Sequence, residues 1–253
     1  MPDLSRQRWV VIGGLASVTA VSWVYILAGA GMGANPDSRA MMDMTTDWSP
    51  EYVALMLAMW WVMMVAMMLP SAAPMILLFA AVSRRSGEGE NAVPPTALFA
   101  AGYLIVWGGF SLIAVSLQWG LDKLALLNPM MASASVPFGG ALLIATGAYQ
   151  MTPLKHACLR HCRSPIQFLG RHWQPGAAGA MRMGIEHGLY CLGCCWVLMT
   201  LLFYGGVMNL VWIAGIALYV LVEKLLPAGH KIGRLIGVVL ILWGTGLLIR
   251  FLA

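Results

Sequence analysis

Apolar runs long enough to cross a bilayer recur along this chain, and they constrain the fold more than any motif does. Seven segments reach or approach the roughly 17–25 residues that a transmembrane helix needs. They lie near residues 9–31, 52–80, 95–119, 136–152, 178–204, 207–226 and 232–252. Only 10% of the 253 residues are charged, against about 25% in a soluble domain. The sequence therefore predicts an all-α fold, a polytopic transmembrane helical bundle in which residues 1–253 form a single membrane domain.

The distribution of basic residues predicts the orientation of this bundle. Lysine and arginine collect in the cytoplasmic loops of membrane proteins. With the amino terminus in the cytoplasm, the outer side holds 3 of the 15 basic residues (Arg39, Lys123 and Arg250) and the inner side holds the other 12. We therefore expect a cytoplasmic amino terminus, seven spans and an outer carboxyl terminus. The basic residues form no patch interleaved with aromatics, which argues against nucleic-acid binding.

A histidine and three cysteines share one face of the fifth predicted span. His187, Cys191, Cys194 and Cys195 are separated by helical steps of three, four, seven and eight, which place side chains on the same side of a helix. Soft metals prefer thiolate and imidazole ligands. A single cysteine here would be read as a small apolar packing residue. Three within five residues, beside a histidine and near mid-bilayer, predict a metal or redox site.

A second pair of cysteines lies in the inner segment before that span. Cys158 and Cys162 are four residues apart, so one helical turn would bring their thiols together. Neighbouring basic charge favours the thiolate, which is the metal-binding form. The alternative is a basic helix on the membrane surface whose cysteines have no function.

Methionine is the third candidate donor. Met63 and Met67, like Met64 and Met68, follow a four-residue step in the second span. Such stripes are more often adaptable packing than ligands, but a thioether binds Cu(I) without first losing a proton. Further methionines stand at 41, 42 and 44 in the outer loop. Thioethers toward the oxidising side and thiols toward the reducing side are the order that a Cu(I) relay would need.

Prolines and charges inside the apolar runs give further expectations. Pro70 and Pro74 are expected to kink the second span, and Glu223 and Lys224 are expected to pair with each other at the inner end of the sixth. The sequence contains no G-x-S-x-G, H-E-x-x-H or glycine-rich phosphate loop. Hydrolases of these types and ATP-driven pumps are therefore not indicated.

Three runs of the sequence resemble a known family. Residues 63–71, 153–165 and 188–196 are similar to those of bacterial proteins of unknown function described as predicted metal-binding integral membrane proteins, sometimes labelled copper chaperones. The run from Cys191 to Trp196 is the most specific part, and the resemblance extends from the second span to the last. It implies metal handling, with copper the expected metal, in a bacterial inner membrane.

The leading hypothesis is an integral membrane protein that binds Cu(I) and transports it or delivers it to a cuproprotein or metallochaperone partner. Cys191, Cys194 and Cys195 are then the core ligands, with His187 a fourth. Cys158 and Cys162 form a cytoplasmic donor or acceptor pair, and the second-span methionines form the outer path. Zn(II) is the alternative metal, because three cysteines and a histidine are also a structural zinc set.

Two hypotheses from other classes stay open. The first is a membrane thiol–disulfide oxidoreductase that passes electrons between the two cysteine groups, which would need an accessible thiolate and a resolving cysteine. Against it, Cys194 and Cys195 point about 100° apart on a regular helix. The second is a non-catalytic assembly subunit of a membrane complex. A non-enzymatic role is favoured over an enzymatic one.

Overall fold

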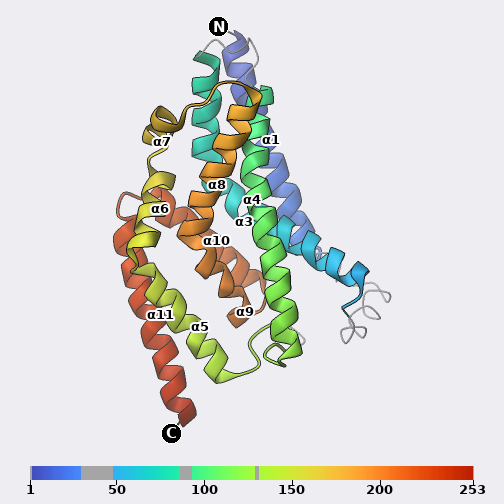
Figure 1. Ribbon diagram of the computed structural model, residues 1–253, viewed down its shortest axis with the longest axis vertical. Helices are drawn as coiled ribbons and strands as arrows, with labels where there is room; N and C mark the ends of the chain where they lie inside the picture. The colour runs from blue at the N-terminus through green and yellow to red at the C-terminus, as the bar shows by residue number, and fades with distance from the viewer. Residues whose placement is uncertain (1, 30–47, 86–92, 129–130, 253) are drawn as a thin grey trace.

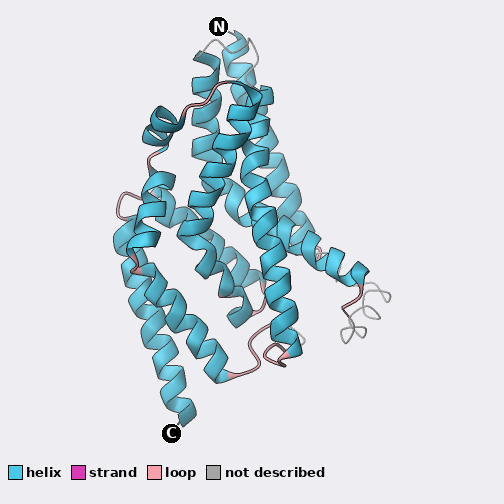
Figure 2. Ribbon diagram, in the orientation of Figure 1, coloured by secondary structure: helices cyan, strands magenta, loops and turns pink. Residues whose placement is uncertain are grey.

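The computed structural model describes residues 2–29, 48–85, 93–128 and 131–252, and within these ranges it is built from helices (Figure 2). The one β feature there is an isolated bridge between Leu127 and Ser133. The predicted all-α fold is therefore confirmed. The methionines at 41, 42 and 44 lie outside the described residues. The helices are α1 (Pro2–Leu27), α3 (Pro50–Arg85), α4 (Val93–Lys123), α5 (Val136–Gln150), α6 (Pro153–Arg163), α7 (Pro165–His172), α8 (Gly176–Thr200), α9 (Leu202–Gly205), α10 (Leu210–Leu225) and α11 (Gly229–Leu252).

Five stretches of the described helices are long and apolar enough to cross a membrane. They are Arg6–Leu27, Pro50–Arg85, Val93–Lys123, Gly176–Gly205 and Gly229–Leu252. The other two predicted spans are α5, with 15 residues, and α10, with 16, which are shorter than the roughly 17 residues of a full span. The start of α1 and the end of α11 lie at opposite ends of the molecule (Figure 1), as an odd number of spans requires. The total of seven spans and their orientation remain predictions.

Glycines allow the close approach of two helix pairs, α4 with α8 and α5 with α11. Where α4 meets α8, Gly102 lies against the carbonyl of Met181 and Gly184 lies against the backbone of Phe99, with no room for a Cβ at either glycine. Helices α5 and α11 run side by side (Figure 1) and meet through four glycines of the same kind. Small residues allow membrane helices to approach this closely.

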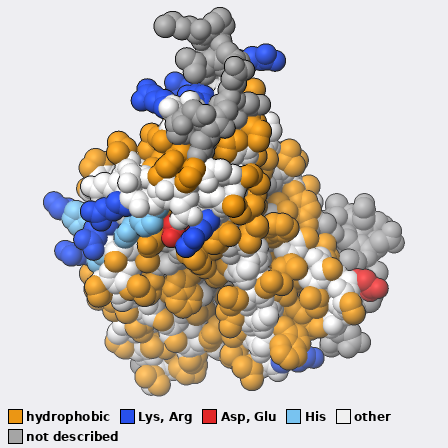
Figure 3. Space-filling view, turned by 45° about the horizontal axis from the view of Figure 1, so that its top comes forward, with side chains coloured by type: hydrophobic (Ala, Val, Ile, Leu, Met, Phe, Trp, Pro, Cys, Tyr) orange, Lys and Arg blue, Asp and Glu red, His pale blue; other side chains and the backbone are white. Residues whose placement is uncertain are grey.

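Helices α1 and α11 present apolar side chains outward. Val21 on α1 is 69% exposed and Leu242 on α11 is 66% exposed. Figure 3 shows hydrophobic side chains over much of the visible surface, with basic side chains in the upper part of the view and at its lower edge. Apolar surface of this extent fits a lipid environment.

Helix α3 continues through both of its internal prolines as one helix of 36 residues. Its first half runs obliquely in Figure 1 and its last turns run upright, which agrees with the bend expected at Pro70 and Pro74. Its buried face carries a row of methionines through the centre of the molecule: Met56, Met59, Met63, Met64, Met67, Met68 and Met75.

The segment between α5 and α8 folds back onto the bundle as helix α6. The side chain of Thr152 caps this helix by accepting a hydrogen bond from the Lys155 N–H, and Pro153 occupies its first turn. The helix ends before Pro165, which starts α7. Because α6 packs along α8, its side chains reach the middle of that helix.

Candidate metal centre

Helix α8 supplies three buried thiols. Cys191, Cys194 and Cys195 share one face, at most 1% exposed, and the structure therefore brings together the core residues expected from the sequence. The Cys194 and Cys195 thiols each donate a hydrogen bond to the Cys191 carbonyl oxygen at 3.0 Å. All five cysteines of the chain are free thiols.

Helix α3 adds a thioether to this group. The Sγ of Cys195 lies 3.9 Å from the Sδ of Met68. Met63, Met64 and Met67 are also buried, and the thioether that Cys195 contacts is that of Met68. Met68 is therefore the member of the predicted methionine stripe that the structure places at the cysteines.

Helix α6 brings the second pair of cysteines to the first. The Cys162 side chain interacts with Cys191 and Cys194, and these contacts raise the pKa of the Cys162 thiol well above its ordinary value. Cys158 lies against Gly193, where an added Cβ would come within 2.7 Å of its Sγ. Burial raises the pKa of Cys158 as well. The sequence predicts two separate groups of cysteines, a cytoplasmic pair and a group within the fifth span. In the structure they form one cluster, which α6 and α8 share.

Lys224 is the residue at this cluster that the sequence reasoning did not assign to it. Its ammonium nitrogen donates hydrogen bonds to the Cys191 Sγ at 2.9 Å and to the Ser71 Oγ at 3.0 Å. The Tyr103 hydroxyl lies 3.1 Å from the same sulfur. A cation at this distance favours the thiolate form of Cys191. The signal was present in the sequence, because a lysine in an apolar helix is a functional candidate.

Glu223 pairs with Lys155 rather than with its neighbour Lys224. The Lys155 Nζ lies 2.7 Å from the Glu223 Oε1, and both side chains are at most 2% exposed. The same ammonium group donates to the Gln150 side chain, and the Tyr219 hydroxyl donates to Glu223 at 3.0 Å. This buried network fastens the first turn of α6 to the last turn of α10. It holds α6 in the position from which Cys162 reaches α8.

Lys224, which contacts the cluster at Cys191, lies in the last turn of α10. Cys191 is therefore beside the end of α10, although it lies near the middle of its own apolar span, Gly176–Gly205. His187 lies one turn from Cys191 on the same helix and packs against the rings of Phe99 and Tyr103, with centroids 6.1 and 5.7 Å away. Its buried Nδ1 has no hydrogen-bond partner among the residues that the structure describes.

The donor atoms suit a soft metal ion. Thiolate and thioether sulfur are the ligands that Cu(I) prefers in proteins, and four thiols and one thioether meet here from three helices. Within the described part of the chain, no three His, Cys, Asp or Glu side chains stand in a ready-made metal-binding arrangement. Two of the thiols instead bond to the Cys191 carbonyl, so they would have to turn away from it to bind an ion.

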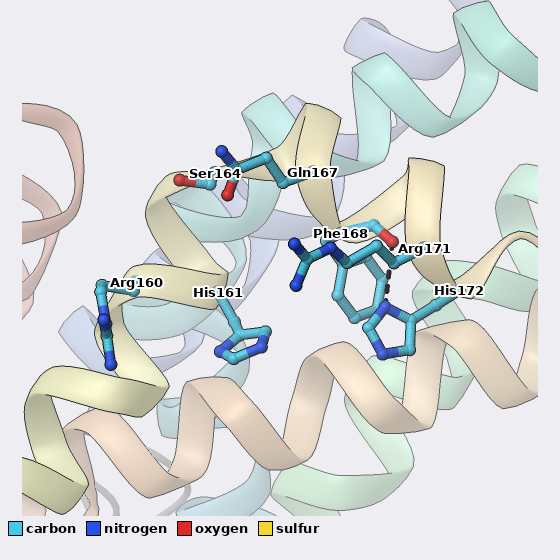
Figure 4. A pocket seen from close by; sticks show the side chains of 7 residues that line it. All are labelled: Arg160, His161, Ser164, Gln167, Phe168, Arg171 and His172. Atoms are coloured by element: carbon cyan, nitrogen blue, oxygen red, sulfur yellow. Dashed lines mark hydrogen bonds between the residues drawn. The ribbon is translucent and has the colours of Figure 1, made fainter.

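Two adjoining basic cavities open on the other side of α6. The first, of 260 Å³, is lined by Arg160, His161, Ser164, Gln167, Phe168, Arg171 and His172 (Figure 4). The second, of 600 Å³, shares Arg160 and Ser164 with it and adds Arg163 and Arg234. His161 stacks on Tyr190 with ring centroids 4.1 Å apart. Because His161 lines the first cavity and Tyr190 belongs to α8, this ring pair joins the cavity to the helix that carries the cysteines.

Most of the chain matches the model of a known family. Residues 57–247 match the model of a family, PpoB2, described as a copper chaperone. The matched range includes all five cysteines, Met68 and Lys224. No curated protein and no solved structure matches the chain.

Proposed function

We propose that this chain, which belongs to the PpoB2 copper chaperone family, is an integral membrane protein that binds Cu(I) at the α6–α8 cysteine cluster and passes it on. The observation that carries the proposal is the meeting of Cys162 with Cys191 and Cys194 beside Met68. An all-sulfur donor set favours Cu(I) over Zn(II), because thioether ligation is characteristic of copper sites. The cysteines and Met68 are thus the proposed ligands, and His187 is not.

Lys224 supports this assignment through its charge. A Cu(I) ion held by two thiolates carries one net negative charge, and burying an uncompensated charge is costly. The ammonium group beside Cys191 would neutralise it. Lys224 is then a residue that adjusts the charge of the site without binding the ion.

The placement of Cys158 supports a role in transfer. This thiol is more exposed than those of α8 and lies at Gly193, next to Cys194 along the chain. We therefore assign Cys158 as the exchange position, through which Cu(I) enters or leaves the buried group. The basic cavities on the far side of α6 would attract an acidic partner protein to the same helix.

The test is an anaerobic Cu(I) titration of the detergent-purified chain beside the variant Cys191→Ser/Cys194→Ser/Cys195→Ser. We expect tight binding by the wild type and its loss in the variant. His187→Gln is the matched control, from the same helix face, and should bind like the wild type. Full affinity and stoichiometry in the triple variant would end the assignment.

Thiol–disulfide exchange is the second candidate, and one observation favours it. Cys162 and Cys191 come from different helices and lie together, with Lys224 promoting the Cys191 thiolate. Oxidation of the Cys191 thiolate and the Cys162 thiol would form one disulfide, release one proton and pass two electrons to an acceptor such as a quinone, which takes its second proton from water. Trapping a disulfide between α6 and α8 in cells by mass spectrometry would favour this reading, and uniformly reduced thiols would count against it.

A further inference from the structure

Two methionine sulfur atoms converge on one amide where the early turns of α3 meet the late turns of α4. The Gln118 Nε2 lies 3.6 Å from the Met56 Sδ and 3.2 Å from the Met131 Sδ. The Trp60 indole N–H donates to the Gln118 Oε1 at 2.7 Å, which fixes the direction of the amide. Gln118 is 2% exposed, so its amide N–H groups rely on weak thioether acceptors. Lone pairs of both sulfur atoms therefore point to one place.

Met131 reaches this place from a backbone conformation that favours glycine. Its φ is 54°, a left-handed value that side chains with a Cβ rarely adopt. The Met131 N–H donates to the Asn128 carbonyl and the Asn128 N–H donates to the Ala132 carbonyl, each at 2.8 Å. This resembles the hairpin position at which glycine is normally found. Strained residues of this kind cluster at binding sites.

Ala125 in the same loop also has a positive φ, of 52°, but a helix end accounts for it. The Leu126 N–H donates to the Leu121 carbonyl at 2.9 Å, which is the bond that closes a helix with a left-handed residue. Met131 caps no helix. Its left-handed conformation instead places its sulfur beside the Gln118 amide.

The surroundings favour a cation. A cavity of 160 Å³ is lined by Trp48, Tyr52, Gln118, Asp122, Leu127, Asn128 and Met131. The charged member of this lining is the carboxylate of Asp122, which accepts a hydrogen bond from the Trp48 indole at 3.0 Å. The Asp122 carboxylate and the Met131 thioether line this cavity, and the Met56 thioether contacts Gln118, which is also part of the lining. Together they form an electron-rich, soft environment.

The buried face of α3 connects this cavity to the cysteine cluster. Met56, which contacts Gln118 of the cavity lining, and Met68, which contacts Cys195, both belong to the methionine row on that face. They are twelve residues apart, or about 18 Å along a helix. An ion bound at Met56 would therefore be at one end of a row of thioethers that leads to the thiols.

We propose that Met56 and Met131 form a second Cu(I) site, a thioether site at Gln118, with Asp122 drawing the cation into the adjoining cavity. The inference rests on the proposed function and adds a second point at which the same ion is bound. Cu(I) takes the position of the Gln118 amide nitrogen between the sulfur atoms, and the amide swings aside. No electron or proton is transferred, because thioethers bind the ion in their neutral form.

The experiment is an anaerobic titration of the full chain with Cu(I), repeated with redox-inert Ag(I), on wild type, Met56→Leu/Met131→Leu and Met75→Leu. Leucine keeps the size of methionine and removes its sulfur. Met75, buried on the same helix, is the matched control. We expect the double variant to lose the weaker class of bound ion and the control to lose none. Equal stoichiometry in wild type and double variant would overturn the proposal.

Two further variants separate the causes of a negative result. Met131→Gly removes the sulfur but suits a positive φ, so it should fold at least as stably as wild type and still lose the weaker site. A Cys191→Ser/Cys194→Ser/Cys195→Ser chain should keep this weaker site alone. If that chain binds no Cu(I) or Ag(I), the thioether site is absent while the cysteine site stands. If it binds as tightly as wild type, the proposed function fails instead.

Discussion

The Lys224 ammonium nitrogen lies 2.9 Å from the sulfur of Cys191, within a group of thiols that two helices share. The residue before it, Glu223, turns to the other side of α10 and binds Lys155 of α6. Adjacent residues of one helix end thus serve two purposes. One sets the charge at the sulfur atoms, and the other fixes the helix that carries Cys158 and Cys162.

Replacing Lys224 by leucine should weaken Cu(I) binding. The substitution removes the positive charge and adds no sulfur ligand, so the buried copper–dithiolate group loses its compensation. We expect the affinity to fall by about tenfold or more, which corresponds to roughly 1.4 kcal/mol. Competition with a Cu(I) chelator measures it. Lys231→Leu, at an exposed position of α11, is the control; equal affinities in all three proteins would contradict the role given to Lys224.

Breaking the Lys155–Glu223 pair should loosen α6. Glu223→Gln leaves the Lys155 ammonium buried without its partner, and removal of one member of a buried pair costs about 3–5 kcal/mol. Thermal unfolding in detergent should show the loss, and alkylation of Cys158 and Cys162 should become faster. The double variant Lys155→Met/Glu223→Leu leaves no unpaired charge and should recover part of the stability. A single variant as stable as wild type would show that the pair does not hold α6.

Cu(I) binding should strengthen as the pH rises. Contact with Cys191 and Cys194 raises the pKa of Cys162, so this thiol is protonated at neutral pH and must release its proton to bind the ion. Each proton released makes the affinity rise about tenfold per pH unit until the raised pKa is reached. A titration series from neutral to alkaline pH measures the slope. Cys162→Ser should reduce it, and an unchanged slope would exclude Cys162 as a ligand.

The same pKa shift has the opposite effect on the metal-free fold. Since the pKa of Cys162 is higher in the folded than in the unfolded chain, its contribution to stability is fully present below the ordinary thiol pKa. It is lost as the pH rises from that value through the raised one. Unfolding of metal-free protein over this alkaline range should show the decline, and Cys162→Ala should flatten it.

The α4–α8 contact should not tolerate a methyl group. A Cβ at Gly184 would collide with the backbone carbonyl of Phe99, which cannot move aside as a side chain can. We expect Gly184→Ala to cost about 1–3 kcal/mol of stability, the usual range for overpacking. Gly109→Ala on α4 meets no atom within 4 Å and should be neutral or slightly stabilising. Equal melting temperatures for the two variants would contradict this packing.

The sequence predicted the helices and the shared face of Cys191, Cys194 and Cys195, because both follow from local periodicity. It did not predict that Cys162 would join them. That contact depends on the pair between Lys155 and Glu223, which are 68 residues apart, and no periodic pattern encodes such a pairing. The direction of Lys224 was missed for a similar reason, since a lysine next to a glutamate suggests a local pair.

His187 shows a second limit of prediction from helical periodicity. Its spacing from Cys191 puts both on one helix face, and this periodicity made it a candidate ligand. The structure surrounds it with aromatic rings from α4 and α7. Spacing along one helix specifies the face of a residue but not the partners that other helices bring to it.

X-ray absorption at the copper edge of Cu(I)-loaded protein tests the central claim most directly. The α6–α8 cluster, with Met68, offers sulfur donors alone, so the account predicts a first shell of sulfur without the scattering pattern of an imidazole. The same spectrum of the Cys191→Ser/Cys194→Ser/Cys195→Ser variant should lose the thiolate contribution. A first shell that contains histidine nitrogen, or a spectrum unchanged in the variant, would contradict the claim that these cysteines hold the ion.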